Sequence, residues 1–597
     1  MERLVSGVSP QSLFPRKPTI RFYPEVEICP LCGAKLKVHK TQPTTVVTLD
    51  IGAFTAKETR LYCHCHDAVY SSSELRALAP ERGTFGFDII VHVGRALFVR
   101  SLGVQEVVDE LRQRNISISK SEVAFLGKKF IAYLAHAHRE AREDIRRGMR
   151  KRGGYILHVD GTCEGSSPNL FCGLDELSNL VLDSVKIPSE KRELLLPFFK
   201  RIKAQYGTPV ALVHDMGGGI LAAVEEVFPD APDFICHFLF LRDIGKDLFG
   251  KEYKIILGRL KKHGIRTALR KRLRALEKKI EDDSRALPDF VSDFDMGAFE
   301  TSSLSQVPAI SAYALIQWIF DAPSDAAGYG FPFDNPHLAF FQRIKAAHGV
   351  LKRIMDIRLR DNFRDNKPLC RLWYLLDKVA GDKKLAGAAA SMEEKIRVFD
   401  ELRQALRIAL PDGKDGLNDD GTNDDITTIE SAVKAFRQRV MTDDRLTANT
   451  DYLGMIAQID KYWHLLFADP ITVQTPTGPI EIIPQRTNNI LERFFRDLKR
   501  GCRKKTGASN LTKMLTSLLA DTPLIANLKS EQYLNAILGN CKSLEQRFSQ
   551  IDTALVREYL ASQKSQPQKF AAKITPLIKQ KNLPDALLQM FKQAKVS

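Results

Sequence analysis

The sequence predicts a multidomain α/β protein with a small metal-binding module near its N-terminus. Its 597 residues are enough for several domains, each with its own core. Between residues 153 and 238, short apolar segments of strand length alternate with amphipathic helical segments. Four of the ten cysteines fall before residue 66, and from about 245 to 475 the pattern is predominantly helical. We therefore expect a mixed β-sheet core, a large helical insertion and a distinct N-terminal region.

The charge of the chain favours a polyanionic partner. Lys and Arg number 88 against 72 Asp and Glu, which gives a net charge of +16. A balance of this size is typical of proteins that bind nucleic acid. There is no run of about 18 apolar residues, and the N-terminus lacks the features of a secretory signal. We expect a cytoplasmic, nucleoid-associated protein without a membrane partner.

The first 75 residues are predicted to form a zinc ribbon. Cys29-Pro-Leu-Cys32-Gly is a turn in which glycine permits two thiolates to point inward together. A second pair follows about 30 residues later, formed by Cys63 with either Cys65 or His66. Four of these five side chains would complete a Zn²⁺ site, whereas the alternative is a small β-hairpin with reduced cysteines. Zinc is favoured because so short a region has little apolar core of its own.

The remaining cysteines are not expected to form a disulfide framework in an intracellular chain. Five lie in or beside apolar segments and are expected to pack in the core: Cys163, Cys172, Cys236, Cys370 and Cys541. Cys502 lies in a basic run and has no assigned role.

Residues 76–150 are predicted to contain a helix-turn-helix. The segment 101–114 has apolar residues at helical spacing, and Asn115-Ile-Ser-Ile118 breaks the pattern. Ser119 then caps a second helix, with Glu122 at the capping-box position. A plain helical hairpin is the alternative. The DNA-binding interpretation assigns contacts with phosphates or base edges to Lys120, Lys128 and Lys129.

The core pattern from 151 to 245 predicts a particular order of elements. Strands are expected at 155–160, 169–175, 180–187, 209–215 and 233–237, with helices at 189–206 (capped by Ser189) and 218–228. The order β-β-β-α-β-α-β, with acids at the ends of the first and fourth strands, is that of the RNase H fold. Those acids are Asp160 and Asp215.

Asp160 and Asp215 are candidate ligands of divalent metal ions. Neighbouring strands would bring the two carboxylates together, and bound Mg²⁺ (or Mn²⁺) would relieve their repulsion. Mg²⁺ needs only a few carboxylates in addition to waters and substrate oxygens. Alternatively, each is an aspartate in a glycine-containing turn.

Glu492 is the candidate third acid. If Asn489 is the N-cap of a helix, Glu492 stands at the third helical position, where it could instead close a capping box. The same helix carries a basic stripe able to follow a DNA backbone, formed by Arg493, Arg496, Arg500 and Lys504.

Three segments resemble the catalytic blocks of DDE transposases from bacterial insertion sequences and their Mutator-type relatives. They are YILHVDGT, PVALVHDMGGG with its following helix and FPDAP, and RTNNILERFFRDLKRGCRKKTG. The resemblance implies that Asp160, Asp215 and Glu492 are the catalytic acids, that a helical insertion separates the last two, and that the N-terminal region recognises transposon ends. It also implies at least a dimer on double-stranded DNA.

One departure from the family pattern concerns histidine. Mutator-type enzymes tend to carry Cys-x-x-His after the second acid, whereas here Cys236 is followed directly by His237. His237 could lie near the site or be a core histidine at a strand end, and the second interpretation is favoured. His158 and His214 are likewise expected to be structural.

Six regions follow from these patterns. They are a zinc ribbon (1–75), a helix-turn-helix region (76–150), a first catalytic part (151–245), a helical insertion (246–475), the helix of the third acid (476–510) and a helical C-terminal region (511–597). Within the insertion, Pro411–Asp425 is interpreted as a solvated linker, because Gly416 occupies the first ligand position of a would-be EF-hand.

The predicted function is metal-dependent DNA cleavage and strand transfer. One alternative is another RNase H-fold nuclease, which has no obvious need for the insertion and the recognition modules. A second alternative is a non-catalytic DNA-binding regulator derived from a transposase. The presence of all three acids argues against the regulator.

Overall fold

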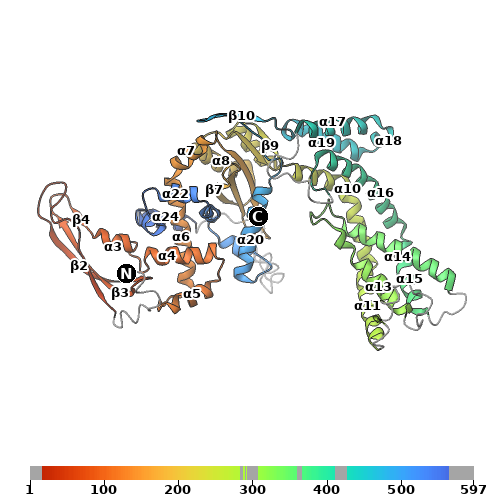
Figure 1. Ribbon diagram of the computed structural model, residues 1–597, viewed down its shortest axis with the longest axis horizontal. Coiled ribbons are helices and arrows are strands. Elements are labelled where there is room, and N and C mark those ends of the chain that lie inside the picture. The colour runs from red at the N-terminus through yellow and green to blue at the C-terminus, as the bar shows by residue number, and fades with distance from the viewer. Residues whose placement is uncertain are drawn as a thin grey trace, which may run out of the picture. The chain divides into compact units, whose positions relative to one another are not determined.

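The structure, a computed structural model, describes residues 17–282, 287–288, 291, 307–358, 366–410 and 426–563. The chain is a mixed α/β protein that divides into two compact units (Figure 1). Unit 1 consists of residues 1–234 and 470–597, and unit 2 of residues 235–469. Unit 2 is therefore inserted into unit 1, with boundaries close to the predicted 245 and 475.

Unit 1 begins with a four-stranded sheet. Strand β3 (Gly52–Cys63) is central: it pairs antiparallel with β2 (Lys37–Thr48) and β4 (Ala68–Tyr70), and parallel with β1 (Thr19–Phe22). Two small apolar clusters stabilise this module, and one of them is formed by Cys29, Leu36 and Cys63. This small core agrees with the expectation that the module has little apolar material of its own.

A helical region follows the sheet. Its elements are α3 (Ser73–Leu78), α4 (Phe87–Gly94), the π-helical turn η1 (Arg95–Val99), α5 (Val104–Gln113), α6 (Lys120–Glu140) and α7 (Arg142–Lys151). The predicted helix pair corresponds to α5 and α6. The Ser119 hydroxyl accepts a hydrogen bond from the Glu122 backbone N–H at 3.1 Å, which confirms Ser119 as the N-cap of α6.

The central sheet of unit 1 has the order β7-β6-β5-β8-β9. Its strands are β5 (Ile156–Thr162), β6 (Asn169–Asp175), β7 (Leu180–Ile187), β8 (Ala211–His214) and β9 (Asp233–Ile235). Strands β5, β6 and β7 are successively antiparallel, and β8 lies parallel to β5. Helices α8 (Arg192–Tyr206) and α9 (Gly218–Val227) connect β7, β8 and β9.

Several predicted boundaries are wrong by one or two residues. Strand β5 continues past Asp160 to Thr162, and β8 is limited to Ala211–His214 instead of 209–215. Helix α8 has Lys191, not Ser189, as its N-cap, because the residues before it form a loop that brings Glu190 to Asn169. Strand β9 ends at Ile235 rather than at residue 237. Cys236 is already the N-cap of the next helix, so the change from strand to helix occurs two residues early.

The chain re-enters unit 1 at a hairpin and continues through helices. These elements are β10 (Ile471–Thr475), β11 (Gly478–Ile482), α20 (Asn489–Thr506), α21 (Thr512–Ser517), η3 (Thr522–Lys529), α22 (Glu531–Leu538), α23 (Leu544–Ser549) and α24 (Thr553–Ser562). The hairpin packs on the central sheet in an apolar cluster that contains Ile156, Val213 and Val473. The same cluster contains Phe234 and Ile471. Phe234 is the last residue of unit 1 before unit 2, and Ile471 is the second residue after unit 2.

Unit 2 is helical in its described part. Its elements are α10 (His237–Lys262), α11 (Ile265–Glu281), α13 (Val307–Phe320), η2 (Ala322–Asp325), α14 (Pro336–Arg358), α15 (Lys367–Ala380), α16 (Lys383–Leu406), α17 (Ile426–Thr442), α18 (Asp444–Thr447) and α19 (Thr450–Leu466). The predicted linker at 411–425 and the tail beyond 563 lie outside the described residues. Across the described residues of both units, no helix is long and apolar enough to cross a bilayer.

Candidate functional site

Asp160 lies on β5, and Asp215 directly follows the neighbouring strand β8. The parallel register of β5 and β8 pairs Ile156 with Ala211 and His158 with Val213. Continued by two residues, this register brings Asp160 opposite Asp215. Adjacent strands are about 4.8 Å apart, so both carboxylates stand at the same end of the sheet.

Helix α20 is attached to β5 by the side chain of Asn488. This buried asparagine donates from Nδ2 to the carbonyl oxygen of Val159 at 2.9 Å, and its Oδ1 lies 2.9 Å from His158 Nδ1. His158 Nε2 in turn lies 2.8 Å from a carboxylate oxygen of Glu176. The third sequence block is thereby attached next to Asp160, although it lies some 330 residues further along the chain. The buried position of His158 agrees with the structural role expected for it.

The capping box that was the alternative for Glu492 is not formed. Helix α20 begins at Asn489, and its N-cap is Asn488, whose side chain makes no cap hydrogen bond because it binds β5 instead. Glu492 is therefore the fourth residue of the helix rather than the third. Its backbone N–H bonds to the Asn488 carbonyl in the ordinary helical pattern. Glu492 therefore does not stand at the capping-box position.

The carboxylates influence each other electrostatically. Burial raises the pKa of Asp160 to about 8, and the negative charges of Asp215, Glu492 and Glu190 add to this effect, while a hydrogen bond from the Gly161 N–H opposes it. Four acids are therefore close enough to interact through their charges. Such a group repels itself in the absence of a cation.

Glu190 is a site residue that the sequence analysis missed. It accepts a hydrogen bond from Asn169 Nδ2, and a Cβ added at Gly161 would lie 2.5 Å from its Oε1. Its carboxylate therefore lies against the residue that follows Asp160. The sequence analysis missed Glu190 because Ser189 has the pattern of a helix N-cap, whereas in the structure α8 is capped at Lys191 and the residues before it form a loop.

The cysteine cluster is the second candidate site. Two groups of ligand atoms lie within 4.8 Å of one another: Cys29, Cys32 and His66 form one, and Cys32, Cys63 and Cys65 form the other. The Sγ atoms of Cys32 and Cys63 are 3.6 Å apart. All five predicted ligands thus gather around Cys32, and they could hold a metal such as zinc. Among the described residues, the acids of unit 1 form no three-residue group this compact.

Tyr70 supports the cluster from outside. Its hydroxyl lies 3.2 Å from Cys29 Sγ, and this hydrogen bond is the main cause that lowers the pKa of Cys29 to about 6. A hydrogen bond of this kind favours the thiolate, which is the metal-binding form. Sequence reasoning did not identify Tyr70, since its contact with Cys29 spans 41 residues.

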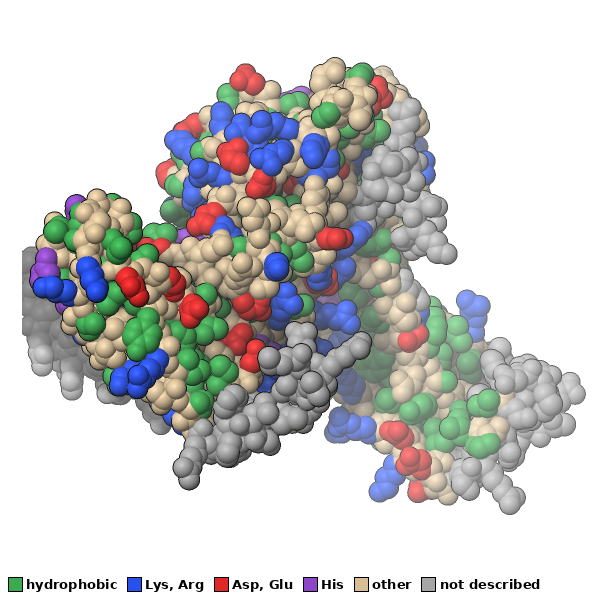
Figure 2. Space-filling model, turned by 60° about the vertical axis from the view of Figure 1, so that its left-hand side comes forward, with side chains coloured by type: hydrophobic (Ala, Val, Ile, Leu, Met, Phe, Trp, Pro, Cys, Tyr) green, Lys and Arg blue, Asp and Glu red, His purple; other side chains and the backbone are tan. Residues whose placement is uncertain are grey.

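The predicted DNA-contacting residues are mostly exposed. Lys120, Lys128 and the α20 residues Arg493, Arg496, Arg500 and Lys504 all reach the surface. Lys129 does not behave as predicted: it is half-buried, its ammonium lies 4.7 Å from the centre of the Phe125 ring, and burial lowers its pKa. On the face drawn in Figure 2, Lys and Arg side chains gather in groups, in keeping with the basic composition.

The other histidines and cysteines are mostly structural. His237 is buried at the start of α10, and its Nε2 contacts the Leu466 carbonyl. His214 is buried and bonds to Asp215 O and to Asp233. Four of the five cysteines expected in the core are buried, as is Cys502, but the expectation is wrong for Cys163. Cys163 is exposed because it stands in the loop just after β5.

Comparison with known proteins gives no match: no protein-family model matches the chain, and no curated protein does so. The residues and their geometry therefore carry the functional conclusion.

The attachment of α20 can be tested through stability. We expect Asn488→Ala to lower the free energy of unfolding by about 2–3 kcal/mol, because it leaves buried polar groups of Val159 and His158 without their partner. Chemical denaturation measures this loss. The control is Asn535→Ala at an exposed position of α22, for which we expect a change below about 0.5 kcal/mol. Equal effects of the two substitutions would show that Asn488 does not hold the helix.

Proposed function

We propose that this chain is a DNA transposase that cleaves and joins DNA strands at transposon ends, with Asp160, Asp215 and Glu492 as its catalytic acids. The observation that carries the proposal is the proximity of these three acids. Asp160 and Asp215 share a strand register, and the charge of Glu492 acts on Asp160. They come from three segments that resemble the catalytic blocks of DDE transposases.

The sheet topology supports an RNase H-like core as part of this proposal. That fold was expected from the order β-β-β-α-β-α-β, with neighbouring strands that bring Asp160 and Asp215 together. The order β7-β6-β5-β8-β9 and the parallel pairing of β5 with β8 agree with it. The insertion of unit 2 before α20 agrees with the long separation of the second and third acids.

The donor set fits Mg²⁺ or Mn²⁺. The site offers carboxylate oxygens, which are the ligands that these hard cations prefer. Asp160, Asp215 and Glu492 would hold the ions, and Glu190 is a further acid whose charge acts on Asp160. A pair of ions is roughly 4 Å apart, so its ligands need not all converge on one point. Bound ions would supply charge stabilisation for phosphoryl transfer.

The protein residues have separate tasks in this proposal. Asn488 holds the start of α20 against β5 and so keeps Glu492 beside Asp160. The exposed basic residues of α20 bind the DNA backbone next to the acids. The cysteine cluster and the α5–α6 pair recognise the transposon end, and two subunits would bring two ends together.

Cleavage of the DNA that flanks the gene tests the proposal. Purified protein incubated with labelled duplexes of these flanks should nick and join them in Mg²⁺ or Mn²⁺ and should be inactive with a chelator. If the protein binds the flanking DNA but never cuts it with either ion, it is a regulator rather than an enzyme.

The basic stripe of α20 makes a separate prediction. Replacing Arg496 and Arg500 with alanine should weaken DNA binding about equally for all sequences. The slope of log affinity against log salt should shrink by about 0.9 for each DNA phosphate that the variant no longer neutralises. Fluorescence anisotropy at several salt concentrations measures the slope. A change in sequence preference with an unaltered slope would contradict backbone binding.

A further inference from the structure

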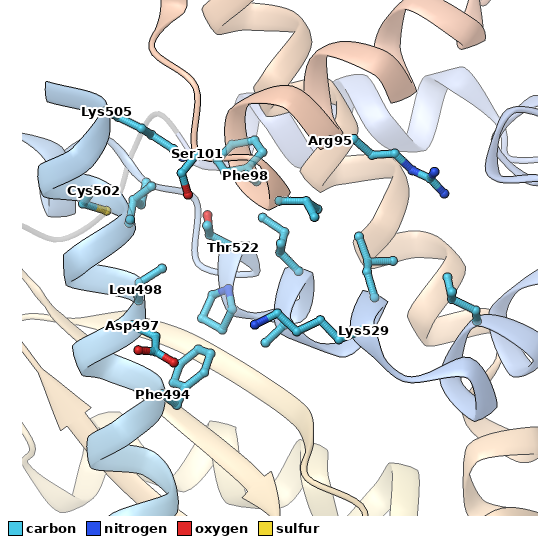
Figure 3. Close-up of a pocket in the computed structure, with 18 residues that line it drawn as sticks. Arg95, Phe98, Ser101, Phe494, Asp497, Leu498, Cys502, Lys505, Thr522 and Lys529 are labelled. Carbon is cyan, nitrogen blue, oxygen red and sulfur yellow. The ribbon is translucent and has the colours of Figure 1, made fainter.

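Unit 1 contains a pocket on the opposite side of α20 from Glu492. Its volume is about 450 Å³, and its walls come from η1, α20, η3, Leu534 of α22 and the loop residues Ser101 and Leu518 (Figure 3). The α20 residues that line it recur every three or four positions, from Phe494 to Lys505, and therefore occupy one helix face. Glu492, Arg496 and Arg500 project from the other face, so the pocket is separate from the acidic site.

The walls of the pocket are mainly apolar. Phe98, Phe494, Leu498, Ile525 and Leu528 are among the lining residues, and the volume falls within the range of about 300–1,000 Å³ typical of small-molecule sites. An apolar body of moderate size would bury surface against these side chains.

The polar groups of the pocket are divided between its ends. In Figure 3, Lys505 and Ser101 lie near one end together with Phe98, whereas Asp497 lies near Phe494 at the other end. Arg95 and Lys529 also line the pocket, so its lining includes three basic residues and a single acid. This distribution favours an anionic ligand with its charge at the Lys505 end.

Lys505 is a partly buried cation in the pocket wall. It is half-buried, and its ammonium lies 4.4 Å from the centre of the Phe98 ring. In the part of the chain that the structure describes, no acidic side chain pairs with it. Burial lowers the pKa of its ammonium, which means that the charge is held at a cost in free energy. A ligand anion would offset that cost.

The backbone beside Lys505 is also unusual. Ser101 has a left-handed conformation, with φ of 57°, where glycine would be unstrained, and it follows the π-helical turn η1. π-Helical turns are frequent at functional sites, and residues with strained backbone conformations cluster there as well. Serine at this position adds a hydroxyl to the pocket wall that glycine would not provide.

We propose that this pocket binds a small organic anion with an apolar body, whose anionic group lies between Lys505 and Ser101. The ligand would contact the catalytic helix, the turn that precedes α5 and the segment η3. This site is independent of DNA binding and of the metal ions.

The test uses the full chain and the fluorescent anion 1-anilinonaphthalene-8-sulfonate as the probe. We expect one saturable site, from which decanoate displaces the probe at least about tenfold better than the uncharged decanol does. Lys505→Met should raise the Kd of the probe about tenfold, because it removes the charge and keeps the apolar stem. The matched control is Lys499→Met on the same helix but outside the pocket, which should alter the Kd less than twofold.

A second variant separates binding from folding. Ser101→Gly should raise the melting temperature by about 2 °C, because it relieves a left-handed serine, and should also weaken probe binding severalfold. A purely structural role for Ser101 would give the first effect without the second and would overturn its assignment. The proposal is overturned if binding does not saturate, if Lys505→Met binds as the wild type does, or if decanol competes as well as decanoate.

Discussion

Alanine at Asp160 or Asp215 should reduce Mg²⁺-dependent strand cleavage by about 10³-fold or more. Loss of ~4 kcal/mol of charge stabilisation in the transition state slows a reaction by that factor. Binding of end DNA should persist, because the basic surfaces are unaltered. Folding should persist as well, since removing one of the mutually repelling carboxylates around Asp160 relieves an unfavourable interaction. Gel assays of cleavage and anisotropy of DNA binding measure the two activities separately.

Glu492→Gln refines the test of the third acid. Glutamine preserves the size and helical preference of the side chain but is a poor Mg²⁺ ligand, so we expect the same loss of cleavage. Glu225→Gln provides the control, because Glu225 is an exposed residue of α9. If Glu492→Gln cleaves normally, Glu190 becomes the candidate third ligand, and the corresponding Glu190→Gln protein should then be inactive.

Removal of zinc should unfold the N-terminal module while leaving the central sheet intact. The cysteines are surrounded by only a small apolar cluster. In comparable small modules, bound zinc contributes roughly 10 kcal/mol or more to folding. We expect about one zinc per chain in protein purified without chelator, and its loss in Cys29→Ser. Elemental analysis gives the metal content, and limited proteolysis shows which region becomes accessible.

Two further substitutions check the zinc prediction. Cys163→Ser should retain its metal, because Cys163 lies outside the cluster. Tyr70→Phe should weaken zinc binding about 10- to 100-fold, because it removes the hydrogen bond to Cys29. Wild-type protein without stoichiometric zinc would contradict the predicted site.

The elements of the central sheet were largely predictable because their patterns are local. The segments 169–175 and 180–187 correspond to β6 and β7 without any shift. Asp160 and Asp215 were found because each follows a run of apolar strand residues, although β5 itself continues to Thr162. The Ser119 cap was found because capping depends on residues only three positions apart.

The rest of the site depends on contacts between distant segments, which local patterns do not encode. Asn488 had the pattern of a residue just before a helix, and nothing nearby indicated that its amide would bind Val159. Glu190 approaches Asp160 only because the sheet has folded. Lys129 was expected to be exposed, but it is half-buried over Phe125 from the preceding turn of the same helix.

Because unit 2 is inserted into unit 1, some contacts within unit 1 can form only late during translation. Helix α6 completes its packing with C-terminal helices: Tyr133 stacks on Phe548, and His138 lies 3.1 Å from the hydroxyl of Tyr533, 395 residues later. At ribosomal rates of about 5–20 residues per second, that partner emerges roughly 20–80 s after α6. Unit 2, whose sequence is continuous, can fold during this interval. During this interval the apolar face of α6 lacks its later partners, and a nascent chain cannot assemble its acidic site before α20 has emerged.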